Sequence, residues 1–297
     1  MSSPLLECVR RYADANADRF GVAPTPIPGL SAMRATAPSK MQHAISKPLV
    51  ALVLQGAKRV AMGSTTLDFG AGQSLLIAAD VPNVSQVTRA SAGAPYYSLV
   101  LDIDPATTRS LVLEIGVAQP QTGVPVRVDP TEAEVADTAL RLMRLLDRPN
   151  SIPILQDPLV REMHYWLLAG RHGAGIRALG FADSHANRIA KAVAVIRSEY
   201  AETLPVERLA EVAGMSVSSF HQHFRAVTSV APLQFQKQLR LIEARRMMMS
   251  KGAAISDAAY AVGYESIPQF TREYGRFFGS SPARDVRENI GKTWIAA

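Results

Sequence analysis

The sequence of 297 residues contains a single cysteine, Cys8, which excludes an internal disulfide and a cysteine-based zinc site. No apolar run approaches the roughly 18 residues that a membrane-spanning helix needs. The first twenty residues lack the basic-then-apolar order of a secretory signal peptide. We therefore expect a protein of a reducing, cytoplasmic compartment that has no membrane as a partner.

Enzyme signatures are also missing. The sequence has no Gly-x-Ser-x-Gly elbow, no zinc-protease helix and no phosphate-binding loop. Among the short apolar stretches of the N-terminal part, His43 is the one histidine, without the clustered His and Glu ligands of a metal site. His221 and His223 are two apart in a predicted helix, so they point to different faces. We therefore expect no catalytic residue, no metal and no cofactor.

Positive charge is concentrated in the last third of the chain. The formal net charge is +6, and residues 184–297 hold 15 Lys and Arg against 10 Asp and Glu. The other 183 residues are almost neutral, with 17 basic and 16 acidic side chains. A basic module on a neutral body suggests a polyanionic partner such as nucleic acid, although an ordinary solvated basic surface explains the charge equally well.

The N-terminal part is predicted to be rich in β-strands. Short apolar stretches at 49–54, 75–78 and 96–101 are separated by turn residues, a spacing typical of a small sandwich or barrel. Helical periodicity follows at 130–148 and 153–169. Each of these helices has an apolar stripe, which must be buried either on its own domain or against a second subunit.

The length favours more than one domain, and the change of pattern along the chain suggests where they divide. We expect an N-terminal domain over 1–172, with β-strands at 25–128 and helices at 130–170. A glycine-rich linker at 173–183 and a helical domain at 184–297 follow.

The C-terminal third contains a near-repeat at an interval of about 50 residues. Each copy has an alanine where two helices cross, a glycine at a turn, a serine that can cap the next helix, and two aromatic residues four apart. This order predicts two helix-turn-helix units, joined by one long helix at 232–250. The structural residues are Ala210, Gly214, Ser216, Phe220 and Phe224 in the first copy, and Ala259, Gly263, Ser266, Phe270 and Tyr274 in the second.

With these residues the sequence resembles the AraC/XylS family of transcriptional regulators. The segments that carry the resemblance are PVERLAEVAGMSVSSFHQHFRAV (205–227), APLQFQKQLRLIEARRMM (231–248) and ISDAAYAVGYESIPQFTREYGRFFGSSPARDVR (255–287). The N-terminal part is similar to the AraC-type regulator N-terminal domain through TPIPGL (25–30), PLVALVLQGAKRV (48–60) and FGAGQSLLIAADVP (69–82). The resemblance implies an α+β protein: a cupin-like β-barrel with following helices, then an all-α DNA-binding domain.

The resemblance places DNA-contacting side chains on the outward face of each second helix. Gln and Arg there can pair bidentately with adenine and guanine, and Arg can also grip phosphate. Ile267, Pro268 and Gly275 depart from the polar or basic residues expected on the second of these helices, so this helix is expected to read fewer bases. The candidates are Ser218, Ser219, His221, Gln222 and Arg225 in the first unit, and Gln269, Thr271, Arg272 and Arg276 in the second.

The function that follows is a sequence-specific regulator of transcription, expected to be an activator. The resemblance implies double-stranded DNA, RNA polymerase, a small-molecule effector in the barrel and a second copy of the chain as partners. Two alternatives remain open at this stage: a cupin-type enzyme fused to a DNA-binding module, and a DNA-binding protein that responds to no effector.

Overall fold

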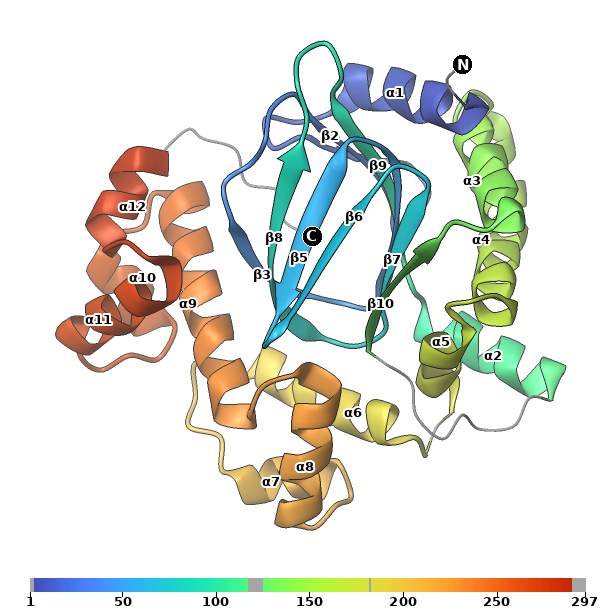
Figure 1. Ribbon diagram of the computed structural model, residues 1–297. Coiled ribbons are helices and arrows are strands. Elements are labelled where there is room, and N and C mark those ends of the chain that lie inside the picture. The colour runs from blue at the N-terminus through green and yellow to red at the C-terminus, as the bar shows by residue number, and fades with distance from the viewer. Residues whose placement is uncertain (1–2, 117–124, 182, 290–297) are drawn as a thin grey trace.

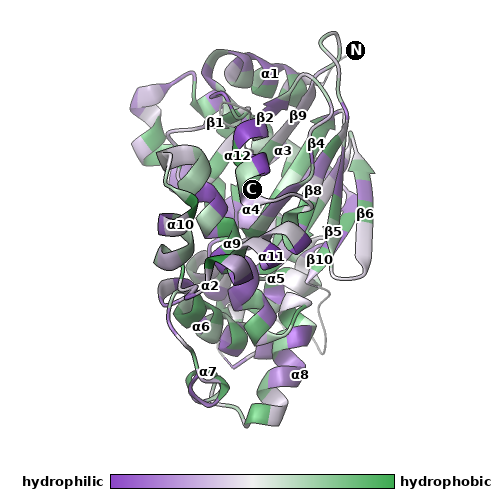
Figure 2. Cartoon of the chain, turned by 90° about the vertical axis from the view of Figure 1, so that its left-hand side faces the viewer, coloured by the Kyte–Doolittle hydropathy of each residue, from purple (hydrophilic) through white to green (hydrophobic). Residues whose placement is uncertain are grey.

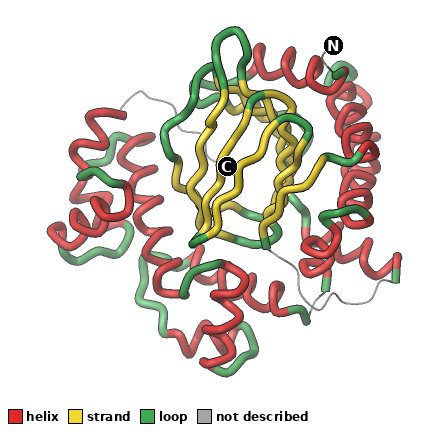
Figure 3. Tube along the Cα trace, viewed as in Figure 1, coloured by secondary structure: helices red, strands yellow, loops and turns green. Residues whose placement is uncertain are grey.

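A computed structural model describes residues 3–116, 125–181 and 183–289 (Figure 1). The strands lie at the centre and the helices surround them (Figure 3). One antiparallel sheet has the order β1 (Val22–Pro24), β2 (Leu30–Ala35), β9 (Tyr96–Asp102), β4 (Leu49–Gln55), β7 (Gln73–Ile77) and β10 (Val126–Pro130). The other has the order β3 (Gln42–Ser46), β8 (Val81–Arg89), β5 (Ala57–Met62) and β6 (Thr65–Gly70).

The two sheets face one another and enclose one of the hydrophobic cores. Side chains alternate along the strands, so in β9 Tyr96 packs into the core between the sheets, while Tyr97 and Leu99 pack into the core beneath the helices. The predicted barrel is therefore present as two facing sheets that are not closed into one ladder.

Helices cover the outer face of the six-stranded sheet (Figure 1). The N-terminal helix α1, which the sequence pattern did not predict, starts at Ser3, whose hydroxyl accepts from the backbone of Leu6. The apolar stripe of α3 is buried against α1 and α4. The helices of this part are α1 (Pro4–Asn16), α2 (Pro105–Ile115), α3 (Ala133–Leu145), α4 (Ile152–Ala169) and α5 (Gly173–Gly180), with a 3₁₀ turn at Pro149–Ser151.

Residues 173–183, predicted as a linker, begin with a packed helix. Ile176 and Leu179 of α5 are buried in the same core as α2 and α4. A Cβ on Gly173 would lie 2.1 Å from the carbonyl oxygen of Leu168, and one on Gly180 would lie 2.7 Å from Val112. These glycines permit close packing rather than a flexible connection. The predicted domain boundaries at 172 and 184 stay predictions.

The C-terminal part is all-helical and is organised around the 20-residue helix α9. Phe235 and Leu239 contribute to a core with α6 to α8, while Ala244 and Met248 contribute to a second core with α10 to α12. This arrangement confirms the predicted α+β fold class. The helices are α6 (His185–Ser198), α7 (Val206–Val212), α8 (Val217–Thr228), α9 (Pro232–Lys251), α10 (Ile255–Ala261), α11 (Ile267–Phe278) and α12 (Pro282–Asn289).

Within the described ranges, none of the helices combines the length and the apolar character that crossing a membrane requires.

Candidate nucleic-acid interface

Helices α7–α8 and α10–α11 form two helix-turn-helix units, which lie at the two ends of α9 (Figure 1). Ser216 and Ser266 occupy the N-cap positions of α8 and α11, where each hydroxyl accepts from a backbone N–H at 3.4 Å. The repeat's two alanines and four aromatic residues are all buried: Ala210, Ala259, Phe220, Phe224, Phe270 and Tyr274.

Both turn glycines adopt the left-handed conformation. Gly214 has φ +60° and Gly263 has φ +84°, which an L-residue with a Cβ rarely adopts. Gly263 also lies against the loop after α6, because a Cβ there would be 2.0 Å from the carbonyl oxygen of Ala201. The turn of the second unit is therefore packed against the connection that leads into the first.

Packing of the aromatic residues directs the opposite face of each second helix to solvent. Figure 2 shows hydrophilic residues interspersed with hydrophobic ones along α8. All nine predicted DNA-contacting residues lie on accessible surface. Ser218, His221, Gln222, Arg225, Gln269, Arg272 and Arg276 are exposed, and Ser219 and Thr271 are half-buried.

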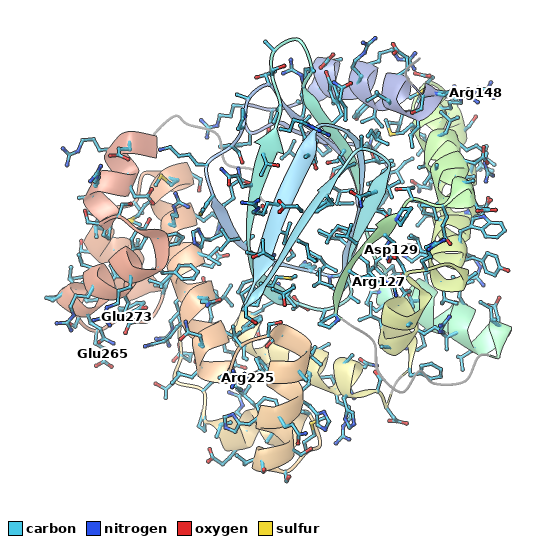
Figure 4. All side chains as sticks on the ribbon, in the orientation of Figure 1. Arg127, Asp129, Arg148, Arg225, Glu265 and Glu273 are labelled. Carbon is cyan, nitrogen blue, oxygen red and sulfur yellow. The ribbon has the colours of Figure 1, made fainter. Side chains whose placement is uncertain are left out.

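Three arginines on these helices stand out because their side chains have no partner among the described residues. Arg225 of α8 (Figure 4) and Arg272 and Arg276 of α11 make no side-chain hydrogen bond or ion pair with any described residue. An exposed guanidinium of this kind is available to phosphates or base edges without first breaking an internal contact.

Four basic residues on α9, in contrast, form contacts within the protein. Arg240 donates to the carbonyl oxygens of Tyr200, Ala201, Glu202 and Gly263 at 2.6–3.0 Å. Three further basic residues of α9 form ion pairs: Lys237 with Glu273, Arg245 with Asp285, and Arg246 with Glu243. Phosphate contact by this helix would compete with these interactions.

The second unit differs from the first in charge. Glu273 lies among the candidate residues of α11 (Figure 4), and its carboxylate accepts from Lys237, from the hydroxyl of Tyr264 and from the amide of Gln269. Gln269 donates one of its two amide N–H groups to Glu273 at 3.3 Å, so the second N–H and the amide oxygen remain for a base. Pro268 falls in the first turn, where its missing N–H has no helical partner.

His221 and His223 point in different directions. His221 is exposed, whereas His223 stacks on His185 of α6 with ring centroids 3.6 Å apart. Burial, His185 and Arg188 together lower the pKa of His223. The described residues contain no group of three His, Cys, Asp or Glu side chains that could hold a metal ion.

The helical part rests on the four-stranded sheet. Arg197 of α6 donates at 2.8 Å to Asp80, in the turn before β8, and also to the carbonyl oxygen of Ile45. The ring of His43 on β3 contacts Phe277 and Phe278 at the end of α11, with centroids 4.8 and 5.0 Å apart. Ile45 is buried in the core of the first helix-turn-helix unit. Strand β3 therefore touches both units.

A cavity of about 90 Å³ lies between the two sheets. Its walls are mostly apolar and include Leu49, Val60 and Phe69. Ser46 and Asn83, hydrogen-bonded at 2.7 Å, belong to β3 and β8, the strands that also contact the helical part. Lys58 and Tyr96 also line the cavity, and sequence reasoning identified neither of them.

A serine, a histidine and an aspartate meet on the other side of the six-stranded sheet. Ser74 Oγ lies 2.8 Å from His172 Nε2, and His172 Nδ1 lies 3.5 Å from Asp129, which also pairs with Arg127 (Figure 4). These are the residue types of a hydrolytic triad. All three side chains are at most 10 % exposed, and none lines the cavity between the sheets. The cluster ties the start of α5 to β7 and β10.

Two family comparisons bear on this architecture. Residues 26–175 match the sequence model described as the AraC-type transcriptional regulator N-terminus, and residues 209–288 match a helix-turn-helix domain. The first match alone covers half of the chain. The protein belongs to the AraC family of transcriptional regulators.

Individual members of the family differ considerably from this chain. The transcriptional activator RhaS of Escherichia coli O139:H28 is 27% identical over 106 residues, which are 36% of this chain and only 38% of RhaS. Apo ToxT K231A from Vibrio cholerae covers 89% of this chain and 99% of its own, with a TM-score of 0.59 and 9% identity. A second ToxT structure, bound to a naphthalenyl butenoic acid, has a TM-score of 0.60 and 10% identity. At such identities the ToxT structures establish the fold alone.

Proposed function

We propose that this AraC-family protein is a sequence-specific DNA-binding regulator of transcription in the cytoplasm, and that an effector bound between its two sheets controls it. The observation that carries the proposal is that Arg225 on α8 and Arg272 and Arg276 on α11 are exposed and have no partner among the described residues. Two buried aromatic residues in each unit fix the orientation of these helices. A rigid α9 between them would fix their spacing. Two such helices reach adjacent major grooves when about 34 Å apart, one turn of DNA.

The direct test is to select DNA fragments with the purified full-length protein and to sequence those that it retains. We expect a shared motif with two short conserved blocks about one helical turn apart. Retention of random sequence would overturn the sequence-specific part of the proposal. The genes next to the recovered sites would indicate which compounds to test as effectors.

Replacing Arg225 with alanine should weaken DNA binding without loss of stability. Its guanidinium is exposed and contacts no described residue, so the fold loses no interaction. A base contact would be worth about 1–3 kcal/mol, and a phosphate contact would add about 0.9 to the slope of log K against log salt. Electrophoretic mobility shifts at several salt concentrations measure both, and thermal melting measures stability.

Arg109→Ala is the matched control, because Arg109 is an exposed arginine on α2, away from both units. This variant should leave the affinity for DNA and the slope of log K against log salt unchanged. Equal losses of affinity in the two variants, or a fall in melting temperature with Arg225→Ala that matches its loss of affinity, would remove Arg225 from the proposed interface.

Control by an effector would act through β3 and β8. Ser46 and Asn83 line the cavity, while Ile45 and His43 on β3 contact the helical part. An effector influences DNA binding only if it binds more tightly to one arrangement of these parts than to the other. The shared strands supply such a connection, because a shift of β3 changes the cavity wall and the surface on which α8 and α11 rest.

Breaking the contact between Arg197 and Asp80 should loosen the docking of the helical part. Both side chains are less than a third exposed, so Arg197→Ala leaves a partly buried carboxylate without its partner. We expect the docked state to lose about 1–3 kcal/mol, seen as hydrogen exchange roughly tenfold faster at the amides of β3.

The control for this variant is Arg59→Ala, which removes an exposed ion pair with Asp68 on the outer surface of the same sheet. The rate of hydrogen exchange at the β3 amides of this variant should match the rate in the wild-type protein. Unchanged exchange at β3 in Arg197→Ala would show that this ion pair does not hold the two parts together.

We further propose that α4 forms a homodimer contact. Ile154 is 72% exposed and Leu155 46% exposed, although the opposite side of the helix is buried. Apolar side chains on an exposed helical face favour association.

Activation through RNA polymerase is an expectation that rests on the family. We assign the Ser74–His172–Asp129 cluster a structural role and no catalysis.

A further inference from the structure

One charged side chain in the cavity is not accounted for by the fold. Lys58 lies on β5 in the same alternating set as Val60 and Met62, which are buried between the sheets. Two residues earlier, the chain crosses from one sheet to the other at Gly56, where a Cβ would be 3.1 Å from the Cα of Tyr96. Lys58 and Tyr96 therefore belong to the same end of the sandwich.

The ammonium group of Lys58 has no counter-ion among the described residues. Its side chain makes no hydrogen bond or ion pair with a described residue, and burial lowers its pKa to about 8. Lys58 is only partly exposed, so its ammonium group is partly desolvated among apolar walls, with no anionic side chain of the described residues paired with it.

Other titratable groups near the cavity do not neutralise this charge. Burial raises the pKa of Tyr96 to about 12, so its hydroxyl stays protonated and can donate a hydrogen bond. Arg89 lies at the same end and donates to the carbonyl oxygen of Gly56. Asp102 is the acidic residue of the lining, but it is exposed and six residues along β9 from Tyr96, roughly 20 Å at the rise of an extended strand.

We propose that the effector of this protein is a small monocarboxylate with an apolar body, and that Lys58 pairs with its carboxylate while Tyr96 donates a hydrogen bond to it. This inference rests on the proposed function, which places the effector between the sheets. A single cation matches one negative charge, whereas a phosphate dianion would bring a second charge that the lining does not compensate. The apolar walls match the hydrocarbon body.

The volume limits the size of the ligand. A dry apolar cavity of about 150 Å³ accepts benzene, which has six non-hydrogen atoms, so six such atoms are the upper limit for a ligand in a cavity of about 90 Å³. Butanoate is the corresponding probe. Butanamide, which has nearly the same shape and no charge, is its matched control.

Binding of butanoate should depend on pH in a way that identifies the lysine. A bound anion stabilises the ammonium form, so the pKa of Lys58 rises on binding and a proton is taken up. With a starting pKa of about 8, calorimetry at pH 8 in buffers of different ionisation enthalpy should record about half a proton taken up per ligand. Affinity should fall about tenfold between pH 7 and pH 9.

The experiment compares the full-length wild-type protein with Lys58→Met and with Lys47→Met, which removes an exposed lysine outside the cavity. Lys58→Met should weaken butanoate binding at pH 7 at least tenfold and abolish the proton uptake, while its binding of butanamide stays at the wild-type level. Lys47→Met should match the wild-type protein with both probes.

Equal affinity of the wild-type protein for butanoate and butanamide would overturn the inference, as would unchanged butanoate binding in Lys58→Met. Failure of the wild-type protein to bind either probe would overturn it too. None of these measurements involves DNA. Butanoate binding therefore tests the anion site, and selection of a DNA motif tests the proposed function, so the failure of one can be distinguished from the failure of the other.

Discussion

Replacing Gly263 with alanine should unfold the second helix-turn-helix unit or displace it from the first. The new Cβ would stand 2.0 Å from the carbonyl oxygen and 2.8 Å from the carbonyl carbon of Ala201, and the backbone would have to keep a φ of +84°. Arg240 donates to the carbonyl oxygens of both residues, so any movement that relieves the overlap also disturbs these hydrogen bonds. We expect a loss of about 3 kcal/mol or more.

Gly214→Ala is the internal control for this prediction. Its φ of +60° carries the same left-handed cost, but the nearest atom to a new Cβ is the end of the Arg188 side chain at 3.2 Å, which can move. We expect a loss of about 1–2 kcal/mol. Hydrogen exchange of the α10–α11 and α7–α8 amides measures each local stability. Equal losses at the two turns would show that the contact with Ala201 is unimportant.

The second large effect is expected from Asp285→Ala. Asp285 pairs with Arg245 through both oxygens at 2.6 and 2.9 Å and accepts from the hydroxyl of Tyr274 at 2.6 Å. The two charged side chains are only 5% and 12% exposed. Removing the carboxylate leaves a buried guanidinium without that partner, which costs about 3–5 kcal/mol. Exchange of the α11 and α12 amides should rise accordingly.

Arg284→Ala provides the comparison, because Arg284 pairs with Glu288 on the surface of the same helix. An exposed ion pair contributes at most about 1 kcal/mol, so this variant should remain close to the wild-type protein. If Asp285→Ala were no more destabilised than Arg284→Ala, the buried pair would not be what holds α12 against α9.

His43 links the same region to the N-terminal sheet and gives the docked state a dependence on pH. Burial first and Arg245 second lower the pKa of His43 to about 4, with Asp285 opposing them. Because the docked state favours the neutral ring, its stabilisation is complete above the ordinary pKa of about 6.5 and is lost as the pH falls toward 4.

The helix-turn-helix units could be predicted from the sequence because their determinants are local. The glycine turn, the serine cap and the aromatic pair of each copy lie within about 15 residues, so spacing alone indicates their roles. Arg240 shows the limit of such reasoning. Its partners lie 23 to 40 residues away, and no local pattern distinguishes it from an arginine that faces DNA.

The cavity between the sheets, the proposed effector site, could not be located from the sequence because it is formed by strands that pair across long separations. Lys58 did leave a signal, as a lone cation at an inward position of the alternation with Val60 and Met62. The sequence predicts a linker at 173–183 because glycines usually mark loops, whereas in the structure Gly173 and Gly180 let α5 approach its neighbours.

The central claim is that one chain places α8 and α11 in successive major grooves of the same duplex. Hydroxyl-radical footprinting on a selected DNA site tests it most directly, with wild-type protein, Arg225→Ala and Arg272→Ala. We predict two protected blocks per chain, about 10 base pairs apart, with Arg225→Ala weakening one block and Arg272→Ala the other. A single protected block, or loss of the same block in both variants, would contradict the claim.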